Sequence, residues 1–181
     1  MSQDRLRWVV FFSQTGSEIV NLIDALDVIP DVIVTNNTTD NINLKLLNEP
    51  LNQRLVFLEK KPSIQDYKNI LRQDDLITLH GWLRIVPAEI CNDYNIYNLH
   101  PAPLSRYPHL KGKDPQKRTV ENGLKYGGST IHVCSPELDS GQIISETSVF
   151  LDDAKDDQEK YNRIYNSSFS LWKTFLKKQL S

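Results

Sequence analysis

Three polar residues of this chain have types and positions suited to proton transfer and hydrogen bonding at a reacting group. Asn98 and His100 lie two positions apart at the end of an apolar run, immediately before Pro101, and Asp139 precedes a Ser-Gly pair further along the chain. Side chains at positions i and i+2 of a strand point to the same side, so we expect the amide and the imidazole to project together. Amides, imidazoles and carboxylates can donate hydrogen bonds or carry protons in a reaction.

A structural role for Asn98 and His100 has to be weighed against a chemical one. Buried polar side chains usually satisfy hydrogen bonds of the fold, so the tripeptide alone favours the structural interpretation. The same sequence offers little for a metal, because its four histidines lack the short spacing of zinc ligand pairs and its carboxylates are scattered. We therefore expect no metal site, and the chemical interpretation needs the context of the fold.

The elements that would position these residues alternate between strands and helices. Apolar runs bounded by turn residues recur about every 20 to 25 residues, as buried strands do, and helical patterns lie between them. This alternation predicts an α/β protein with an open, Rossmann-like, mostly parallel twisted sheet and helices on both faces. Ligands of such sheets bind at the carboxyl ends of the strands, where Asn98 and His100 lie. The expected strands are 6–12, 32–35, 55–58, 76–79 and 96–99, and the expected helices are 17–26, 43–47 and 63–71.

The last third of the chain changes character. Two β-rich runs, 126–133 and 143–151, predict a closing hairpin whose long loop carries Asp139. Residues 156–180 place aromatic and aliphatic side chains at spacings of three and four, which predicts an amphipathic C-terminal helix. No repeat or linker interrupts the pattern, so we expect one domain over residues 1–181.

Composition narrows the classes of partner. Of the 181 residues, 21 are basic and 23 acidic, which gives a net charge of -2 and no broad field for a polyanion. We therefore expect a small-molecule substrate and no nucleic acid. The apolar run near the N-terminus is too short for a membrane span, and two isolated cysteines do not form a disulfide framework, so we expect a cytoplasmic protein. The oligomeric state is not predicted by any of these patterns.

Taken in order along the chain, several segments resemble the folate-dependent formyltransferases. The resemblance covers nearly the whole chain and is closest to those members that formylate glycinamide ribonucleotide in purine biosynthesis. Each segment is weak evidence alone, and their order makes the match specific. The matching segments are 13–18 after the first strand, 81–87, 98–101, 111–115, 128–133, and the Glu-Leu-Asp-Ser-Gly sequence at 137–141.

This resemblance implies transfer of the formyl group of 10-formyltetrahydrofolate, as cosubstrate, to a primary amine that is phosphorylated. It implies that Asn98, His100 and Asp139 are catalytic. The chemistry of these residues agrees, because the Asn98 amide and a His100 imidazolium can both donate to the developing oxyanion while Asp139 keeps His100 protonated and moves protons. By the same resemblance, the folate would contact Leu83, Arg84, Ile85, Val86, Ser135, Leu138 and Asp139, and the amine substrate would contact Gln14, Thr15, Gly16, Ser17, Pro101 and Asn166.

Two departures from the pattern leave alternatives open. The members acting on glycinamide ribonucleotide carry a glutamate on the last helix where Asn166 stands, and residues 111–116 of the basic segment 111–118 resemble members acting on methionyl-tRNA or amino sugars. That basic segment is also typical of a solvated helix start. The acceptor can therefore be a nucleotide-linked amino sugar or another amine. A formyltetrahydrofolate hydrolase and a non-catalytic relative that binds folate or nucleotide are further alternatives.

Overall fold

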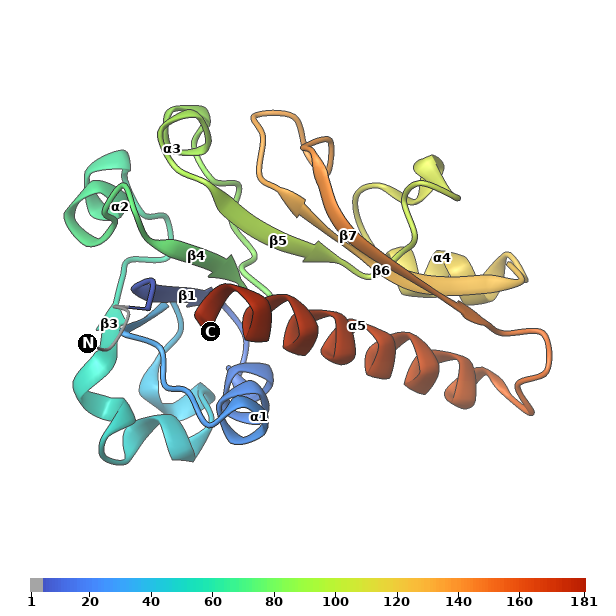
Figure 1. The fold of residues 1–181 in the computed structure, drawn as a ribbon, viewed down its shortest axis with the longest axis horizontal. Helices are drawn as coiled ribbons and strands as arrows, with labels where there is room; N and C mark the ends of the chain where they lie inside the picture. The colour runs from blue at the N-terminus through green and yellow to red at the C-terminus, as the bar shows by residue number, and fades with distance from the viewer. Residues whose placement is uncertain (1–4) are drawn as a thin grey trace. The chain divides into compact units, whose positions relative to one another are not determined.

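A computed structural model describes residues 5–181 of the chain (Figure 1). Its contacts divide into two compact units, the first ending at Tyr97 and including Lys177–Ser181, and the second formed by Asn98–Leu176. The strands are β1 (Trp8–Phe12), β2 (Val32–Thr35), β3 (Leu55–Phe57), β4 (Leu76–Leu79), β5 (Ile96–His100), β6 (Tyr126–Val133) and β7 (Ile143–Phe150). The α-helices are α1 (Ser17–Leu26), α2 (Ile64–Ile70), α3 (Ala88–Asp93), α4 (Pro115–Glu121) and α5 (Asp157–Leu180).

The first unit contains a parallel sheet in the order β3-β2-β1-β4. All five residues of β1 are buried, as expected for a central parallel strand that is covered on both faces. Neighbouring side chains of β1 point to opposite faces: Phe11 stacks on Tyr67 of α2 at 5.7 Å, whereas Phe12 lies on the side of Gly16 at the start of α1. Helices therefore cover both faces of this sheet.

The second unit contains the end of β5 and the antiparallel pair β6–β7. Gly127 and Ser129 of β6 face α5, because a Cβ on Gly127 would lie 2.5 Å from Ile164 and the Ser129 hydroxyl bonds to Ser168. Alternation along the strand places Thr130 and His132 on the opposite face. The long helix α5 thus covers one face of the hairpin, and the other face is left for the loops that follow β5.

The structure confirms the predicted fold class, with strand order β3-β2-β1-β4-β5-β6-β7, the closing hairpin and the C-terminal helix. A capping box at Ser63, with Asp66 as its partner, begins α2. One expectation is wrong: the segment expected as a helix at 43–47 forms only a 3₁₀ turn, Leu44–Leu47. A helix at Ala88–Asp93 was not expected. That residues 1–181 form one domain stays a prediction, and residues 1–4 lie outside the part of the chain that the structure describes.

Candidate active site

A buried polar cluster lies on the face of β5 and β6 that α5 does not cover. Asn98 and His100 come from β5, His132 comes from β6, and Asp139 comes from the loop between β6 and β7. His100 Nδ1 is 3.3 Å from one Asp139 oxygen, and His132 Nε2 is 3.6 Å from the other. Asn98 Nδ2 lies 3.5 Å from His132 Nε2, which is a long contact. The structure therefore brings together all three residues predicted to be catalytic.

The loop that carries Asp139 has a backbone suited to presenting this carboxylate. Asp139 has φ 51°, in the left-handed region that Asp and Asn tolerate better than most residues. Its carboxylate accepts a hydrogen bond from the Gly112 backbone N–H at 2.9 Å, and the neighbouring Ser140 hydroxyl accepts one from Lys111 Nζ at 2.8 Å. Gly141 has to be glycine, because a Cβ there would lie 1.6 Å from the Val133 carbonyl oxygen.

Both ring nitrogens of His100 face hydrogen-bond acceptors. Nε2 is 2.8 Å from the Leu110 carbonyl oxygen, and Nδ1 faces Asp139. Burial lowers the pKa of His100 below its usual value, although the Asp139 charge and the Leu110 carbonyl act in the opposite direction. The expectation that Asp139 keeps His100 protonated stays a prediction, because the Asp139 charge favours the protonated ring and burial opposes it. Nε2 donates to the Leu110 carbonyl, and Nδ1 faces Asp139.

The carboxylate of Asp139 stays ionised despite its surroundings. Burial alone would raise the pKa of Asp139, but hydrogen bonds from His132 and the Gly112 N–H, together with the charges of the two histidines, hold it below its usual value. The side chain is only 6% exposed. A neutral imidazole beside a fixed carboxylate can accept a proton at Nδ1 and share it with Asp139 as an ion pair.

The lowered pKa of His100 predicts that acid destabilises the protein. Below about pH 6.5 an unfolded histidine binds a proton that folded His100 resists, so the free energy of unfolding should decrease as the pH falls from 7 to 5. Urea titrations across this range measure how steeply the free energy of unfolding changes with pH. This slope should be smaller for His100→Gln than for the wild type, by at most about 1.4 kcal/mol per pH unit. The exposed His109→Gln variant is the control. Equal slopes in all three proteins would contradict the pKa direction.

The loop after His100 is anchored to the hairpin. The Thr130 hydroxyl accepts from the Leu104 N–H at 3.0 Å and donates to the Ala102 carbonyl at 2.7 Å, and Glu146 on β7 accepts from the Ser105 N–H at 2.9 Å. The predicted substrate residue Pro101 is half-buried at the start of this loop, directly after His100. Neither Thr130 nor Glu146 was singled out from the sequence, because each is an ordinary residue type for a strand or a surface.

In the first unit, the predicted substrate loop Gln14–Ser17 connects β1 to α1 and is held by side chains from elsewhere. Gly16 has φ 75°, and a Cβ there would lie 2.7 Å from Leu46. The Asn37 amide donates to the Gln14 carbonyl at 2.8 Å, and Asn43 donates to Ser17 Oγ at 3.1 Å and to the Thr15 carbonyl through its backbone N–H. The start of α1 provides backbone N–H groups of the kind that bind anions.

A carboxylate lies close to this predicted anion site. Glu18 is in the first turn of α1, next to Ser17, and its Oε1 is 3.2 Å from Nδ1 of the buried His80. His80 contacts the Thr78 hydroxyl through its other ring nitrogen at 2.9 Å. The charge of Glu18 opposes a phosphate at the same helix end. Glu18 was not singled out from the sequence, because acidic residues are common in first turns of helices.

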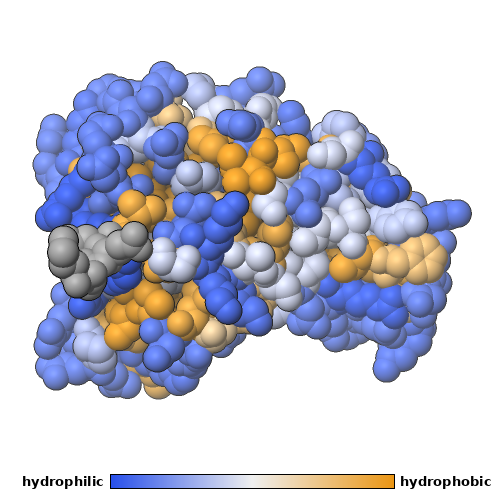
Figure 2. All heavy atoms as spheres, viewed as in Figure 1, coloured by the Kyte–Doolittle hydropathy of each residue, from blue (hydrophilic) through white to orange (hydrophobic). Residues whose placement is uncertain are grey.

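The residues predicted to contact folate lie on two loops, one in each unit. In the first unit, Leu83 and Ile85 are 61% and 84% exposed, and Val86 is buried. In the second unit, Leu138 is 63% exposed. Much of the face seen in Figure 2 is polar, with hydrophobic side chains reaching the surface in places. Exposed aliphatic side chains are typical of a surface that packs against an apolar ligand. Arg84 is exposed, and Ser135 donates to the Glu137 carbonyl.

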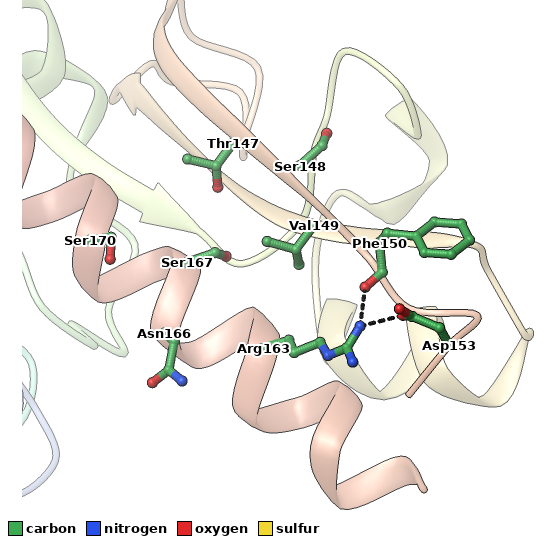
Figure 3. A pocket seen from close by; sticks show the side chains of 9 residues that line it. All are labelled: Thr147, Ser148, Val149, Phe150, Asp153, Arg163, Asn166, Ser167 and Ser170. Carbon is green, nitrogen blue, oxygen red and sulfur yellow. Dashed lines mark hydrogen bonds and ion pairs between the residues drawn. The ribbon is translucent and has the colours of Figure 1, made fainter. Parts of the chain in front are cut away.

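The structure does not bring Asn166 to the polar cluster of Asn98, His100 and Asp139. Asn166 lies on α5 and lines a groove of about 640 Å³ between α5 and β7 (Figure 3). Thr147 lines the same groove and pairs with Ser129, so the groove lies on the α5 face of the hairpin, opposite to His132. The guanidinium of Arg163 in this groove is already bonded to Asp153, Glu159 and the Phe150 carbonyl. The substrate role of Asn166 stays a prediction.

The fold and the cluster together define an α/β protein of Rossmann-like architecture with its polar site at the end of a sheet strand. A family model described as formyl transferase matches residues 6–171. The chain belongs to the formyl transferase family. No helix among residues 5–181 is long and apolar enough to cross a membrane.

Individual relatives agree with this assignment. The chain is 30% identical over 182 residues to the trifunctional purine biosynthetic protein adenosine-3 of Drosophila melanogaster, which covers 92% of this chain and 13% of that protein. It is 29% identical to the phosphoribosylglycinamide formyltransferase of Dictyostelium discoideum, covering 75% of this chain and 79% of the relative. The matches to three of the most similar curated relatives span 13%, 27% and 40% of those proteins' lengths.

Solved structures show the same fold. The crystal structure of phosphoribosylglycinamide formyltransferase from Anaplasma phagocytophilum superimposes with a TM-score of 0.81 at 25% identity, covering 96% of this chain and 86% of the other. The corresponding structure from Streptococcus pneumoniae has a TM-score of 0.78 at 23% identity, with 97% and 99% covered. The latter likeness concerns the fold alone.

Proposed function

We propose that the protein transfers the formyl group of 10-formyltetrahydrofolate to a primary amine, and that the amine is glycinamide ribonucleotide. The observation that carries this proposal is the cluster of half-buried Asn98 with buried His100 and Asp139 in a chain of the formyl transferase family. The names of its relatives, which are phosphoribosylglycinamide formyltransferases and purine biosynthetic proteins, support the choice of acceptor. The reaction needs no metal, because the cluster can supply both hydrogen-bond donation and proton transfer.

The chemistry proceeds through a tetrahedral intermediate. The acceptor amine attacks the formyl carbon of 10-formyltetrahydrofolate, and a new C–N bond forms as negative charge develops on the formyl oxygen. The Asn98 side-chain amide donates a hydrogen bond to this oxyanion, and it is available because its contact with His132 is long. In this arrangement both nitrogens of His100 face protein groups, so the oxyanion-donor role of His100 depends on breaking one of these contacts.

Proton transfer is the step for which His100 and Asp139 are arranged. The attacking nitrogen must lose a proton, and the Asp139 carboxylate, which is already ionised, receives it directly or through water. Nδ1 of His100 shares this proton with Asp139. The same proton then passes to N10 of the folate as the C–N10 bond breaks. The products are the N-formylated amine and tetrahydrofolate, so atoms and protons balance.

The proposal is tested by following consumption of 10-formyltetrahydrofolate spectroscopically with purified protein, in the presence and absence of glycinamide ribonucleotide. The expected result is that the ribonucleotide accelerates formation of tetrahydrofolate in proportion to enzyme concentration. Loss of the formyl group at the same rate without an acceptor would favour a hydrolase. Saturable binding of the folate with no turnover would favour a non-catalytic relative. Either of these results would overturn the proposal.

One observation favours a second candidate acceptor. Glu18 places a carboxylate in the first turn of α1, beside the loop that would hold the phosphate of a ribonucleotide. This charge favours an amine that carries no phosphate at this position, such as an amino sugar whose phosphates lie further away. Substituting such an amine in the same assay separates the two candidates, because the better acceptor has the larger kcat/KM.

A further inference from the structure

The basic segment 111–118 contains residues with different environments. Lys113 and Lys117 are exposed, and Lys117 pairs only with Glu121 on its own helix, at 3.7 Å. Arg118 is half-buried and forms no ion pair with a carboxylate in the described part of the chain. Its guanidinium instead donates to three consecutive backbone carbonyls, His109 at 3.0 Å, Leu110 at 2.7 Å and Lys111 at 2.6 Å. The guanidinium therefore stabilises the backbone conformation of residues 109–111.

The three carbonyls lie at the end of a 3₁₀ turn, Pro108–Leu110, where carbonyl groups lack partners within the turn. The planar fork of an arginine can satisfy several of them at once, which the single ammonium of a lysine cannot do. The Leu110 side chain packs in a buried cluster with Ala102 and Leu104. Arg118 and this cluster therefore hold the turn from two directions.

The same turn contacts both members of the candidate proton-transfer pair. The Leu110 carbonyl that Arg118 bonds is also the acceptor for His100 Nε2, at 2.8 Å. A carbonyl oxygen has two lone pairs and can accept from both. Two residues further on, the Gly112 N–H donates to Asp139 at 2.9 Å. One short stretch of backbone thus fixes the ring of His100 through Nε2 and the carboxylate of Asp139 through Oδ2.

We propose that Arg118 is a positioning residue for catalysis: by binding the carbonyls of residues 109–111 it holds the turn that orients His100 and Asp139 toward each other. The expected effect of Arg118 on kcat rests on the proposed function. Its expected effect on the tautomer of His100 does not. With Leu110 in place, neutral His100 carries its proton on Nε2 and presents Nδ1 to Asp139. Without the guanidinium, the carbonyl is free to turn away, and this tautomer loses its main support.

The test compares Arg118→Met with Lys117→Met, which removes a neighbouring exposed cation from the same helix. Arg118→Met should lower kcat roughly 10- to 100-fold with little change in KM, because small misplacements of reacting groups have effects of this size. In ¹⁵N-histidine spectra recorded above the pKa of His100, the wild-type ring should be mainly the Nε2–H tautomer, and Arg118→Met should shift it toward a mixture. Lys117→Met should change neither quantity.

The proposal requires that Arg118→Met both lower kcat and shift the tautomer of His100. An unchanged kcat, or an unchanged His100 tautomer, in folded Arg118→Met would overturn it. If thermal unfolding shows that Arg118→Met does not fold, Arg118→Gln is measured against the same two criteria, since its amide can still donate to one carbonyl. If the wild-type protein transfers no formyl group, the proposed function is wrong. The comparison of His100 tautomers would still test whether Arg118 positions His100.

Discussion

Replacing Asn98 with alanine should lower kcat for formyl transfer about 10²–10³-fold, the usual effect of removing one oxyanion donor. In the proposed mechanism the Asn98 amide donates to the developing oxyanion, and its contact with His132 is long, so we expect little stability to depend on it. KM for the folate should change little, because the interaction forms mainly in the transition state. Steady-state kinetics at saturating substrates measure the effect, with thermal unfolding as a check on folding.

Two further variants make this prediction specific. Asn98→Asp keeps the size of the side chain but replaces the N–H donor with a negative charge, so it should be at least as impaired as Asn98→Ala. Asn162→Ala removes an exposed amide on α5 that accepts a hydrogen bond from Gln158 of the same helix, and should leave kcat unchanged. A folded Asn98→Ala protein with kcat near the wild-type value would remove Asn98 from the mechanism.

Replacing Asp139 with asparagine should reduce kcat about 10²–10⁴-fold, the range expected for loss of a group in proton transfer. Asparagine tolerates the left-handed backbone at this position and can still accept from the Gly112 N–H, so the loop should keep its conformation. The variant removes the charge that stabilises a protonated His100. The pKa of His100 should therefore fall further, because Asp139 is the main influence that raises it.

Asp114→Asn is a closely matched control for Asp139→Asn. Asp114 also has a left-handed backbone, with φ 53°, and it is exposed at the start of α4 with no side-chain cap hydrogen bond. Its replacement tests the same chemical change in the same backbone conformation away from the cluster. We expect wild-type kcat for Asp114→Asn. Equal losses in the two variants, or none in either, would contradict the assignment of Asp139.

Much of the fold follows from apolar patterning. β2 and β4 begin and end at the predicted residues, and α1 matches its predicted range, because continuous apolar strands and a strongly amphipathic helix leave little ambiguity. The short helix Ala88–Asp93 was missed, since six residues carry too little periodicity to stand out. The segment at 43–47 was read as a helix from its leucines, but Asn43 caps a single 3₁₀ turn there.

The candidate site was predictable only where residue type carries the chemistry. The types and spacing of Asn98 and His100 singled them out, and the family resemblance implied a catalytic role for them and for Asp139. The Leu110 carbonyl and the Gly112 N–H are backbone groups, which no residue type reveals. Burial lowers the pKa of His100, and burial depends on packing that the sequence alone does not define. Arg118 belonged to a run of charges whose members differ only once the turn at 109–111 is formed.

The most direct test of the account follows the formyl carbon itself. 10-Formyltetrahydrofolate labelled with ¹³C at the formyl group is incubated with the protein and glycinamide ribonucleotide, and the products are observed by NMR. The account predicts that the label appears in the formamide of the acceptor, with one tetrahydrofolate formed per formamide, and that Asn98→Ala slows its appearance. Label recovered only as formate, or retained on the folate, would contradict formyl transfer to this amine.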